Sequence, residues 1–571
     1  MFNLNVGQQG YSLSRQLLIA LPFAMLFLFS CVYMVSGSGL VFSFMEHRLS
    51  YEDSYTISVD LTPLVALLAA TCFIILARSK ILLSVLPLSG FLLYPYLGFS
   101  LALGTSSIFL VILGCYKMKL WSEFFSILLA SLSVVYLSSI VYWLIFYPFG
   151  LPYPLIGLAS QEFYLYYVTA PLSVICIAAI VIVSIYKPFN SFRRRGEEET
   201  QVHVSPTDRK TIVYLLLVVG LGIFAAIYPN LPGVNPNSIN IGTDVMHYVP
   251  FLDQVNLDIS KINEVYYGSR PLFFLVLLSF EKALGLSSYW AVSLIPVLII
   301  PALALSMFFL VKEATSDSEC ALWASFFTVA GFHTVVGLYG FLLADMFSLA
   351  LAFTMLTMFF KWSKSFDWRY LMGSVLFGVS LLFSHPWTFD QYVAVLPLVV
   401  IPIIFRKNSK KEKLFVIALM IIAAIGFGAA EILQNDVFGG VGGLEALGFL
   451  SKTATTANFF SGIAYSIFYF SGTMANVVLL VLLVVGLLRH RIGGTAGLYL
   501  TLFPLVTTLA FLIFTVDMKS RILFNIPFGL YAAIGMIEYR KIKDMNLRTI
   551  FPVFIVLLLL AYQLRSLANL I

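Results

Sequence analysis

The sequence predicts an all-α, polytopic integral membrane protein. Apolar runs of about 20 residues, each long enough for one membrane crossing, recur from end to end of the 571-residue chain. Hydrophobic residues make up 60% of the chain and charged residues only 11%, against roughly 25% in soluble domains. A bilayer permits only helices or closed barrels, and these runs lack the two-residue alternation of barrel strands. The runs therefore predict membrane-spanning helices.

About 17 of these runs predict transmembrane helices, and the positive-inside rule orients them. Their approximate bounds are 16–36, 58–77, 81–97, 100–116, 122–147, 163–186, 211–227, 289–311, 321–336, 340–360, 370–383, 391–405, 414–433, 468–488, 496–514, 522–537 and 550–562. With the N-terminus in the cytoplasm, nearly every basic cluster falls on the cytoplasmic side. We therefore expect a multi-pass protein of the cell (plasma) membrane with a cytoplasmic N-terminus.

This orientation depends on one apolar run, 271–286, which we interpret as an amphipathic helix on the outer surface. The run contains Glu281 and Lys282 and reaches Gly285 near its end. If it were counted as a span, every later segment would be inverted. The basic run RKNSKKEK at 406–413 would then lie outside, against the positive-inside rule.

A charged segment at 189–210 divides the chain into two membrane modules. Its sequence, FNSFRRRGEEETQVHVSPTDRK, places basic residues before acidic ones, as is typical of a solvated cytoplasmic linker. Residues 1–188 hold the first six predicted spans and no motif that indicates chemistry. Residues 211–571 hold most of the polar and charged residues that could form a functional site. The net charge of +6 reflects cytoplasmic Lys and Arg, so no nucleic-acid partner is expected.

The longest polar interruption is the predicted outer loop 228–288. Charged side chains are costly near a bilayer, so their presence at its edge suggests a site. Asp244 and His247 lie in GTDVMHYVP, and Arg270 precedes Pro271. Asp is also a favoured N-cap residue, so Asp244 could instead only cap the helix that follows it.

Further polar candidates fall on the same predicted outer side. They are Asp345, His385 (in SHPWTFDQY), Glu431, Lys519 and Arg521 (in TVDMKSRILF). Asp345 lies between apolar residues, where a carboxylate needs a partner or solvent. His385 could simply end a span, and Arg521 could be an interfacial anchor. Basic anchors are disfavoured on the outer side, which favours phosphate binding by Arg521. His333 fits an ordinary interfacial histidine.

A metal site is an open alternative. Asp244, His247, Asp345 and His385 offer the oxygen and nitrogen ligands that Mn²⁺ or Mg²⁺ would need, but no tight ligand spacing supports such a site. We therefore assign no cofactor. The chain lacks G-x-x-x-x-G-K-[ST], H-E-x-x-H and G-x-S-x-G, which argues against ATP-driven transport, zinc proteolysis and a serine nucleophile.

The second module, 211–571, resembles the C-type membrane glycosyltransferases (the GT-C superfamily), with a pattern most similar to archaeal-type members. The resemblance rests on IGTDVMHYVPFLDQV and GSRPLFFLVL, followed by GLYGFLLADMFSLALAF, SHPWTF and SRILFNIPF. It implies that Asp244 is the base or activates the acceptor, that Asp345 is a second outer acid, and that Arg521 grips a lipid phosphate. The first-loop motif is a lone Asp, and a WWDxG-type motif is missing, which argues against en-bloc transfer to protein.

The resemblance implies an enzyme that transfers a sugar from a polyprenyl (dolichyl) phosphate to a glycan, lipid or protein acceptor. The reaction takes place on the extracytoplasmic face and inverts the anomeric carbon. His385 or Asp345 would orient the acceptor or tune the base. Lys519 or Arg270 would assist Arg521 at the leaving phosphate, and His247 and Glu431 complete the expected substrate-binding set.

Three other functions remain open. A transporter or flippase of a lipid-linked saccharide would place ionisable residues inside broken spans. A polysaccharide polymerase or ligase would use a polymeric or lipid-pyrophosphate donor. A non-catalytic assembly subunit would tolerate the combined loss of Asp244, Asp345 and Arg521.

Overall fold

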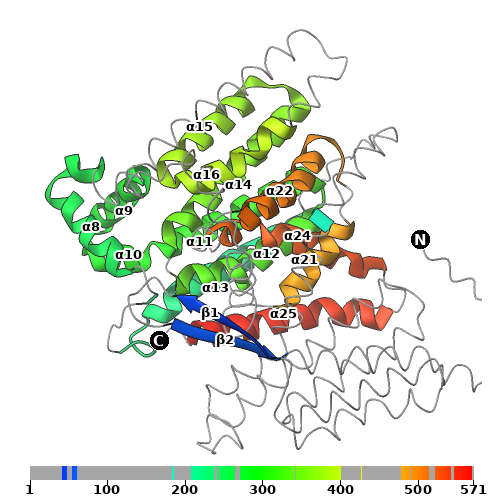
Figure 1. Cartoon of the computed structure of the whole chain (residues 1–571), viewed down its shortest axis with the longest axis horizontal. Helices are drawn as coiled ribbons and strands as arrows, with labels where there is room; N and C mark the ends of the chain where they lie inside the picture. Colours follow the sequence, from blue (N-terminus) through cyan, green and yellow to red (C-terminus); the bar gives the residue numbers. More distant parts are fainter. Residues whose placement is uncertain are drawn as a thin grey trace, which may run out of the picture. The chain divides into compact units, whose positions relative to one another are not determined.

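The computed structural model describes two short strands and most of the chain after residue 208 (Figure 1). The described residues are 41–47, 54–60, 180, 183–184, 208–236, 241–242, 245–263, 270–340, 342–399, 426, 477–489, 492–513, 521–541 and 545–568. Almost all of the spans predicted before residue 188 and most of the linker 189–210 lie outside these residues. Those spans and the boundary between the two modules stay predictions.

The chain divides into two compact units, Met1–Leu172 with Tyr539–Leu558, and Ser173–Glu538 with Leu559–Ile571. In the first unit, β1 (Val41–His47) pairs with β2 (Ser54–Asp60) as an antiparallel hairpin, with Val41 opposite Asp60. The hairpin is an exception to the all-α prediction and takes up the start of the predicted span 58–77. Its second strand, SYTISVD, alternates polar with apolar residues, which is the two-residue period of a strand.

Beyond residue 208 the described elements are helical. In order they are α7 (Arg209–Ile227), η2 (Tyr228–Asn230), α8 (Val245–Leu257), η3 (Ile259–Asn263), α9 (Pro271–Leu284), α10 (Ser288–Leu294), α11 (Pro296–Thr315), α12 (Ser318–Ala330), α13 (Phe332–Tyr339), α14 (Leu343–Ser365), α15 (Trp368–Ser384), α16 (Pro386–Val393), α21 (Val477–Arg489), α22 (Gly494–Ile513), α24 (Phe528–Met536), η5 (Ile537–Lys541) and α25 (Met545–Ala568). Within the second unit, α11 packs against α7, α12 and α14, and α14 packs against α15. α24 packs against α12 and α21.

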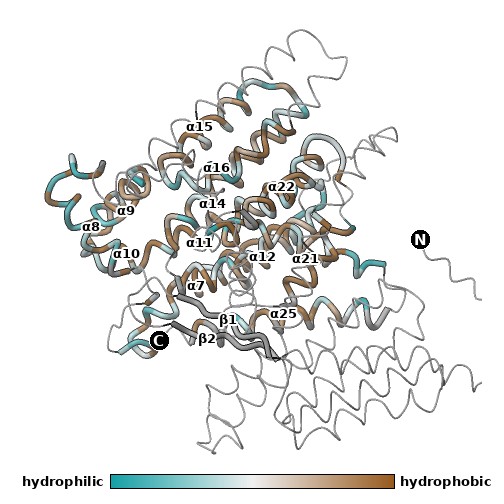
Figure 2. The backbone as a smooth tube through the Cα atoms, viewed as in Figure 1, coloured by the Kyte–Doolittle hydropathy of each residue, from teal (hydrophilic) through white to brown (hydrophobic). Residues whose placement is uncertain are grey.

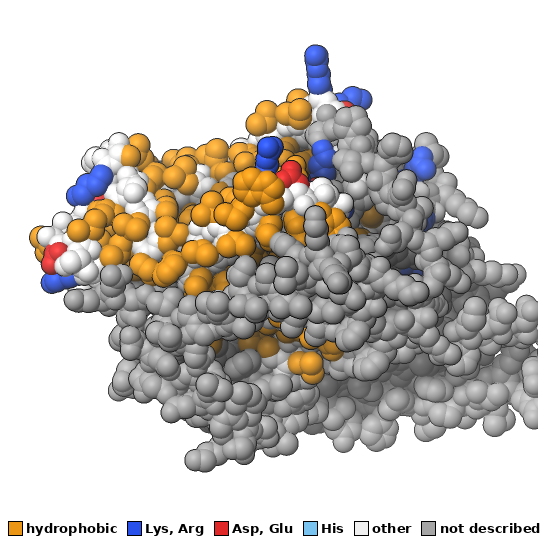
Figure 3. All heavy atoms as spheres, turned by 90° about the horizontal axis from the view of Figure 1, so that it is seen from above, with side chains coloured by type: hydrophobic (Ala, Val, Ile, Leu, Met, Phe, Trp, Pro, Cys, Tyr) orange, Lys and Arg blue, Asp and Glu red, His pale blue; other side chains and the backbone are white. Residues whose placement is uncertain are grey.

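Four helical segments of the described residues are long and apolar enough to cross a membrane. They are Arg209–Asn230, Ser288–Thr315, Ser318–Leu338 and Leu343–Ser365. Figure 2 shows long hydrophobic tracts along the helices, with hydrophilic residues around α8 and at the ends of other helices. In Figure 3, hydrophobic side chains cover much of the described surface, with few charged side chains among them. A helical membrane protein is thus confirmed, whereas the count of about 17 spans stays a prediction.

Two predicted spans prove to be interrupted helices. The span predicted at 321–336 is divided into α12 and α13 by Gly331, whose backbone leaves the helical region (φ −119°, ψ −147°). The span predicted at 522–537 is divided before α24, where Pro527 is the N-cap residue. Residues 337–339, which separate the predicted spans 321–336 and 340–360, are helical in α13. A hydropathy average over a whole run does not detect such a break, because the glycine or proline that causes it occupies a single position.

The outer loop 228–288 is also largely helical, through α8, η3 and α9. α9 begins with Pro271 at its first turn and ends at Gly285 in the left-handed conformation (φ 62°). Its 14 residues are fewer than the roughly 20 that a membrane crossing needs. The length agrees with our interpretation of α9 as a helix that does not span.

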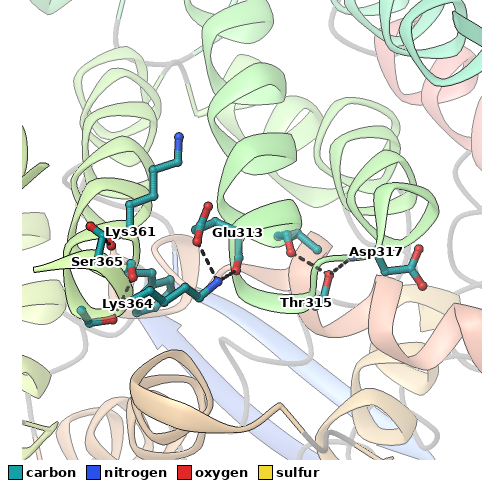
Figure 4. A network of polar contacts seen from close by, with 9 residues as sticks. Glu313, Thr315, Asp317, Lys361, Lys364 and Ser365 are labelled. Atoms are coloured by element: carbon teal, nitrogen blue, oxygen red, sulfur yellow. Dashed lines mark hydrogen bonds and ion pairs between the residues drawn. The ribbon is translucent and has the colours of Figure 1, made fainter. Parts of the chain in front are cut away.

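A set of charged residues gathers where α11 meets α12 and where α14 meets α15 (Figure 4). Lys364 Nζ donates to Glu313 Oε1 at 2.7 Å and to the Glu313 carbonyl oxygen at 2.6 Å. Asp317 caps α12 by accepting from the backbone N–H groups of Glu319 and Cys320. The Glu313–Lys364 contact joins the C-terminal ends of α11 and α14, so the N-terminal end of α14 lies at the opposite end of this helix pair.

Candidate functional site: a buried arginine–histidine–aspartate cluster

Three of the predicted site residues, Arg270, Asp345 and His385, meet in a buried polar cluster. Asp345 Oδ1 lies 3.1 Å from His385 Nε2, and Arg270 Nη2 lies 3.4 Å from the same nitrogen. Arg270 is 4% exposed, Asp345 2% and His385 0%. Arg270 and His385 are 115 residues apart in the chain. Tertiary packing therefore brings together residues that the sequence could place only on the same predicted side.

Local sequence fixes the backbone of each residue. Arg270 precedes Pro271, which disfavours helical backbone at Arg270 and lets α9 begin after it. Asp345 lies in the first turn of α14, where the helix dipole stabilises a negative charge. His385 is extended (φ −164°, ψ 94°) between α15 and Pro386, the first residue of α16. Three helix ends thus present the three side chains.

The contacts of His385 hold its ring in one orientation. The backbone N–H of Thr388 donates to His385 Nδ1 at 3.4 Å, and Thr388 Oγ1 lies 2.8 Å from the same nitrogen. Thr388 therefore holds the Nδ1 side of the ring, and Nε2 lies beside both Arg270 and Asp345. The guanidinium of Arg270 has only N–H donors, and its Nη2 lies 3.4 Å from Nε2.

Burial, the charge of Arg270 and the charge of Arg521, in that order, lower the pKa of His385 well below its usual range. In the unfolded chain the ring would take up a proton near its ordinary pKa of about 6.5. The unfolded state therefore binds more protons than the folded state below that pH. Stability attributable to His385 is complete above about pH 6.5 and is lost as the pH falls toward the folded pKa.

We therefore expect the thermal unfolding midpoint of the purified protein to decrease as the pH is lowered below about 6.5. The matched variant is His385→Gln, which keeps a polar side chain but has no proton to take up. Its midpoint should be lower than that of the wild type near neutral pH and should depend less on pH. An identical pH dependence in both proteins would show that protonation of His385 is not what destabilises the folded protein at low pH.

Two further residues of the cluster were not predicted from the sequence. Tyr248 on α8 is fully buried, and its hydroxyl oxygen accepts from Arg270 Nη1 at 2.7 Å. Thr388 holds the ring of His385, as described above. Tyr248 could have been found from its spacing with Val245, Leu252 and Val255, which form the buried face of α8.

The other predicted residues lie elsewhere or outside the described residues. Arg521 is half-buried at the start of the short helical stretch 521–524, and its charge acts on His385. His247 is exposed on α8, so its side chain is not part of the buried cluster. Asp244, which directly precedes α8 in the sequence, lies outside the described residues, as do Glu431 and Lys519.

The charge of the cluster favours an anion over a metal ion. Within the described part of the chain, no group of three or more His, Cys, Asp and Glu side chains could hold a metal. Asp345 and His385 are adjacent, but the guanidinium of Arg270 lies 3.4 Å from His385 Nε2, and its positive charge repels a cation. The positive charges of Arg270 and Arg521 both act on His385, and such charges attract an anion.

A second buried histidine lies at the interruption between α12 and α13. His333 is fully buried, so it is not the interfacial residue that we expected. Its ring packs against Phe524 and Phe528, with centroids 5.6 and 5.8 Å away. These two residues flank the interruption before α24, so the two helix interruptions face each other. Tyr392 donates to the Asn525 carbonyl oxygen at 2.7 Å within the second one.

Neither protein-family models nor curated proteins give any match to this sequence. The chemistry of the cluster must therefore be judged from its geometry. A buried guanidinium can bind a phosphate, and a carboxylate held by a neutral histidine can orient a hydroxyl group. The arrangement is suited to a reaction that combines an anionic group with a proton transfer.

Proposed function

We propose that this protein is a membrane glycosyltransferase of the GT-C type. It transfers a sugar from a polyprenyl (dolichyl) phosphate to a glycan, lipid or protein acceptor on the extracytoplasmic face. The observation that carries the proposal is the buried Arg270–His385–Asp345 cluster. The guanidinium of Arg270, together with the charge of Arg521 that also acts on His385, suits a lipid phosphate. Asp345 lies at the end of α14 opposite Lys364, and we assign the Lys364 end to the cytoplasmic side.

In the proposed reaction, an acceptor hydroxyl oxygen forms a bond to the anomeric carbon from the side opposite the phosphate. The bond between that carbon and the phosphate oxygen breaks, so the configuration inverts. The proton of the hydroxyl passes to Asp244, and the electron pair leaves with the phosphate on its lipid. Arg270 and Arg521 stabilise the charge that develops on this phosphate, and Asp345 orients the acceptor.

The apolar exterior supports a lipid-borne substrate. Exposed side chains along α15 include Met372, Leu376 and Val379, at 57%, 65% and 46% exposure. Such a surface is typical of contact with lipid tails. A polyprenyl chain can remain among these tails while its phosphate reaches the buried cluster, which lies at the C-terminal end of α15.

The test measures sugar transfer from a labelled polyprenyl-phosphate sugar in proteoliposomes. We expect transfer by the wild type, and at least about a 100-fold loss of turnover in Asp244→Asn. The matched control is Asp253→Asn, an exposed acid on α8 outside the cluster, which should remain active. Inactive wild-type protein with every lipid-phosphate donor tested would refute the proposal, and full activity in Asp244→Asn would remove Asp244 from the mechanism.

One observation favours the transporter or flippase as a second candidate. The two facing helix interruptions place the buried His333 between them, and discontinuous helices line the substrate sites of many transporters. Movement of a fluorescent lipid-linked saccharide across vesicles separates the two functions. A transporter would lose this movement in His333→Leu and keep it in Asp244→Asn, whereas a glycosyltransferase would show the transfer reaction described above.

A further inference from the structure

Tyr248 connects the helical part of the outer loop to the buried cluster. Its ring packs edge-on against Phe273 at 5.5 Å and lies 6.1 Å from Phe274, both on α9. Phe273 in turn contacts Phe347 on α14, two residues after Asp345, with ring centroids 6.0 Å apart. The ring of Tyr248 is therefore fixed by packing, and its hydroxyl oxygen has a defined position.

This fixed hydroxyl group constrains the orientation of Arg270. The guanidinium is a planar fork of N–H donors, so fixing both terminal nitrogens fixes its plane. Nη1 donates to Tyr248 from α8 at 2.7 Å, and Nη2 lies beside His385 at 3.4 Å. The backbone of Arg270 is held as well, because its carbonyl oxygen accepts from Phe274 N–H at the start of α9. Side chain and backbone are therefore oriented before any ligand arrives.

We propose that Tyr248 is a positioning residue for phosphate recognition, which holds Arg270 in the orientation that binds the phosphate of a polyprenyl lipid. The inference rests on the proposed function and adds to it a residue that the sequence did not indicate. Preorganised donors bind an anion more strongly than mobile ones because they lose less freedom on binding. Without the hydroxyl group, Arg270 keeps its charge but loses the Nη1 contact that helps to set its plane.

The test compares Tyr248→Phe with a matched variant, Tyr392→Phe. Each substitution removes one hydroxyl group from a fully buried tyrosine, and each hydroxyl takes part in a hydrogen bond of 2.7 Å. Tyr248 accepts from a guanidinium, whereas Tyr392 donates to the backbone carbonyl oxygen of Asn525. Both variants should unfold at similar temperatures, so a difference in ligand binding reports on Arg270 rather than on general stability.

The probes are a polyprenyl monophosphate, the uncharged polyprenol of the same length, and inorganic phosphate, each titrated in detergent. We expect Tyr248→Phe to bind the monophosphate about tenfold more weakly than the wild type and to bind the polyprenol equally well. Tyr392→Phe should keep the wild-type preference for the monophosphate. Inorganic phosphate should bind far more weakly than the lipid, because it lacks the apolar chain.

The outcomes separate this inference from the function on which it rests. If the wild type prefers the monophosphate and Tyr248→Phe keeps that preference, Tyr248 has no positioning role. If Tyr392→Phe loses the preference to the same extent, the effect is structural and the inference is overturned. If the wild type shows no preference for the monophosphate over the polyprenol, the proposed lipid-phosphate function itself fails. If inorganic phosphate binds as strongly as the lipid, the site recognises a free phosphate ion rather than a lipid phosphate.

Discussion

Replacing Asp345 with asparagine is expected to destabilise the protein by about 3 kcal/mol, because it leaves the charge of Arg270 buried without its neighbouring carboxylate. Both side chains are almost inaccessible to solvent, at 2% and 4% exposure, so water cannot replace the lost partner. The substitution also removes the negative charge beside His385 Nε2, which lies 3.1 Å from Asp345 Oδ1. Unfolding of the purified protein, followed by heat or denaturant, measures the loss. We expect sugar transfer to fall as well.

A double-mutant cycle separates charge balance from chemistry. Arg270→Gln alone should also destabilise the protein, because it leaves the carboxylate without its cation. The double variant Asp345→Asn/Arg270→Gln contains neither charge and should recover at least half of the lost stability. It should not recover transfer, since the phosphate-binding group is gone. Additive losses of stability would show that the two charges do not interact.

The matched control for this cycle is the Glu313–Lys364 pair at the opposite end of α14. Its nitrogen and oxygen atoms lie 2.7 Å apart, but the Lys364 side chain is 48% exposed. Exposed pairs of this kind contribute about 0–1 kcal/mol. Glu313→Gln should therefore be tolerated and remain active, although its ion pair is shorter than the Asp345–His385 contact. An equally large loss at both ends would contradict the role of burial.

Replacing Gly486 with alanine is expected to cost about 3 kcal/mol or more, because α21 and α24 cross in backbone contact at this position. An added Cβ atom would overlap the carbonyl oxygen of Tyr531 on α24. The reciprocal position, Gly535 on α24, would overlap the carbonyl oxygen of Leu482 on α21. Backbone atoms cannot move aside as a flexible side chain does. The thermal unfolding midpoint and the yield of folded protein measure this effect.

The chain offers a matched control in Gly220, in the middle of α7. A Cβ atom added there meets no heavy atom within 4 Å, and the residue is exposed. Gly220→Ala should therefore be neutral or stabilise the protein by about 0.5–1 kcal/mol, the ordinary preference of a helix for alanine over glycine. If Gly486→Ala were equally harmless, α21 and α24 would not pack as closely as the structure indicates.

The sequence predicted the helical membrane class because hydrophobicity is a property of single residues summed over a run. It could not reveal the interruption at Gly331 or the one before α24, since a break of one or two residues barely changes such a sum. It also could not reveal the crossing at Gly486, because the absence of a side chain is informative only when the neighbouring helix is known. The β1–β2 hairpin was not predicted, because the apolar run that begins within its second strand was interpreted as a membrane span despite the two-residue alternation of that strand.

Asp345, His385 and Arg270 were selected from the sequence because a charged or polar side chain among apolar residues needs a partner. The sequence by itself thus determined which residues required an explanation and on which predicted side they lie. Only the tertiary structure decided that Arg270 and Asp345 both lie beside His385 Nε2, and that Tyr248 and Thr388 belong with them. The free-energy cost of burying a polar group depends on that residue alone. The hydrogen bonds and charge contacts that offset this cost depend on atoms that folding brings close, here across 115 residues of chain.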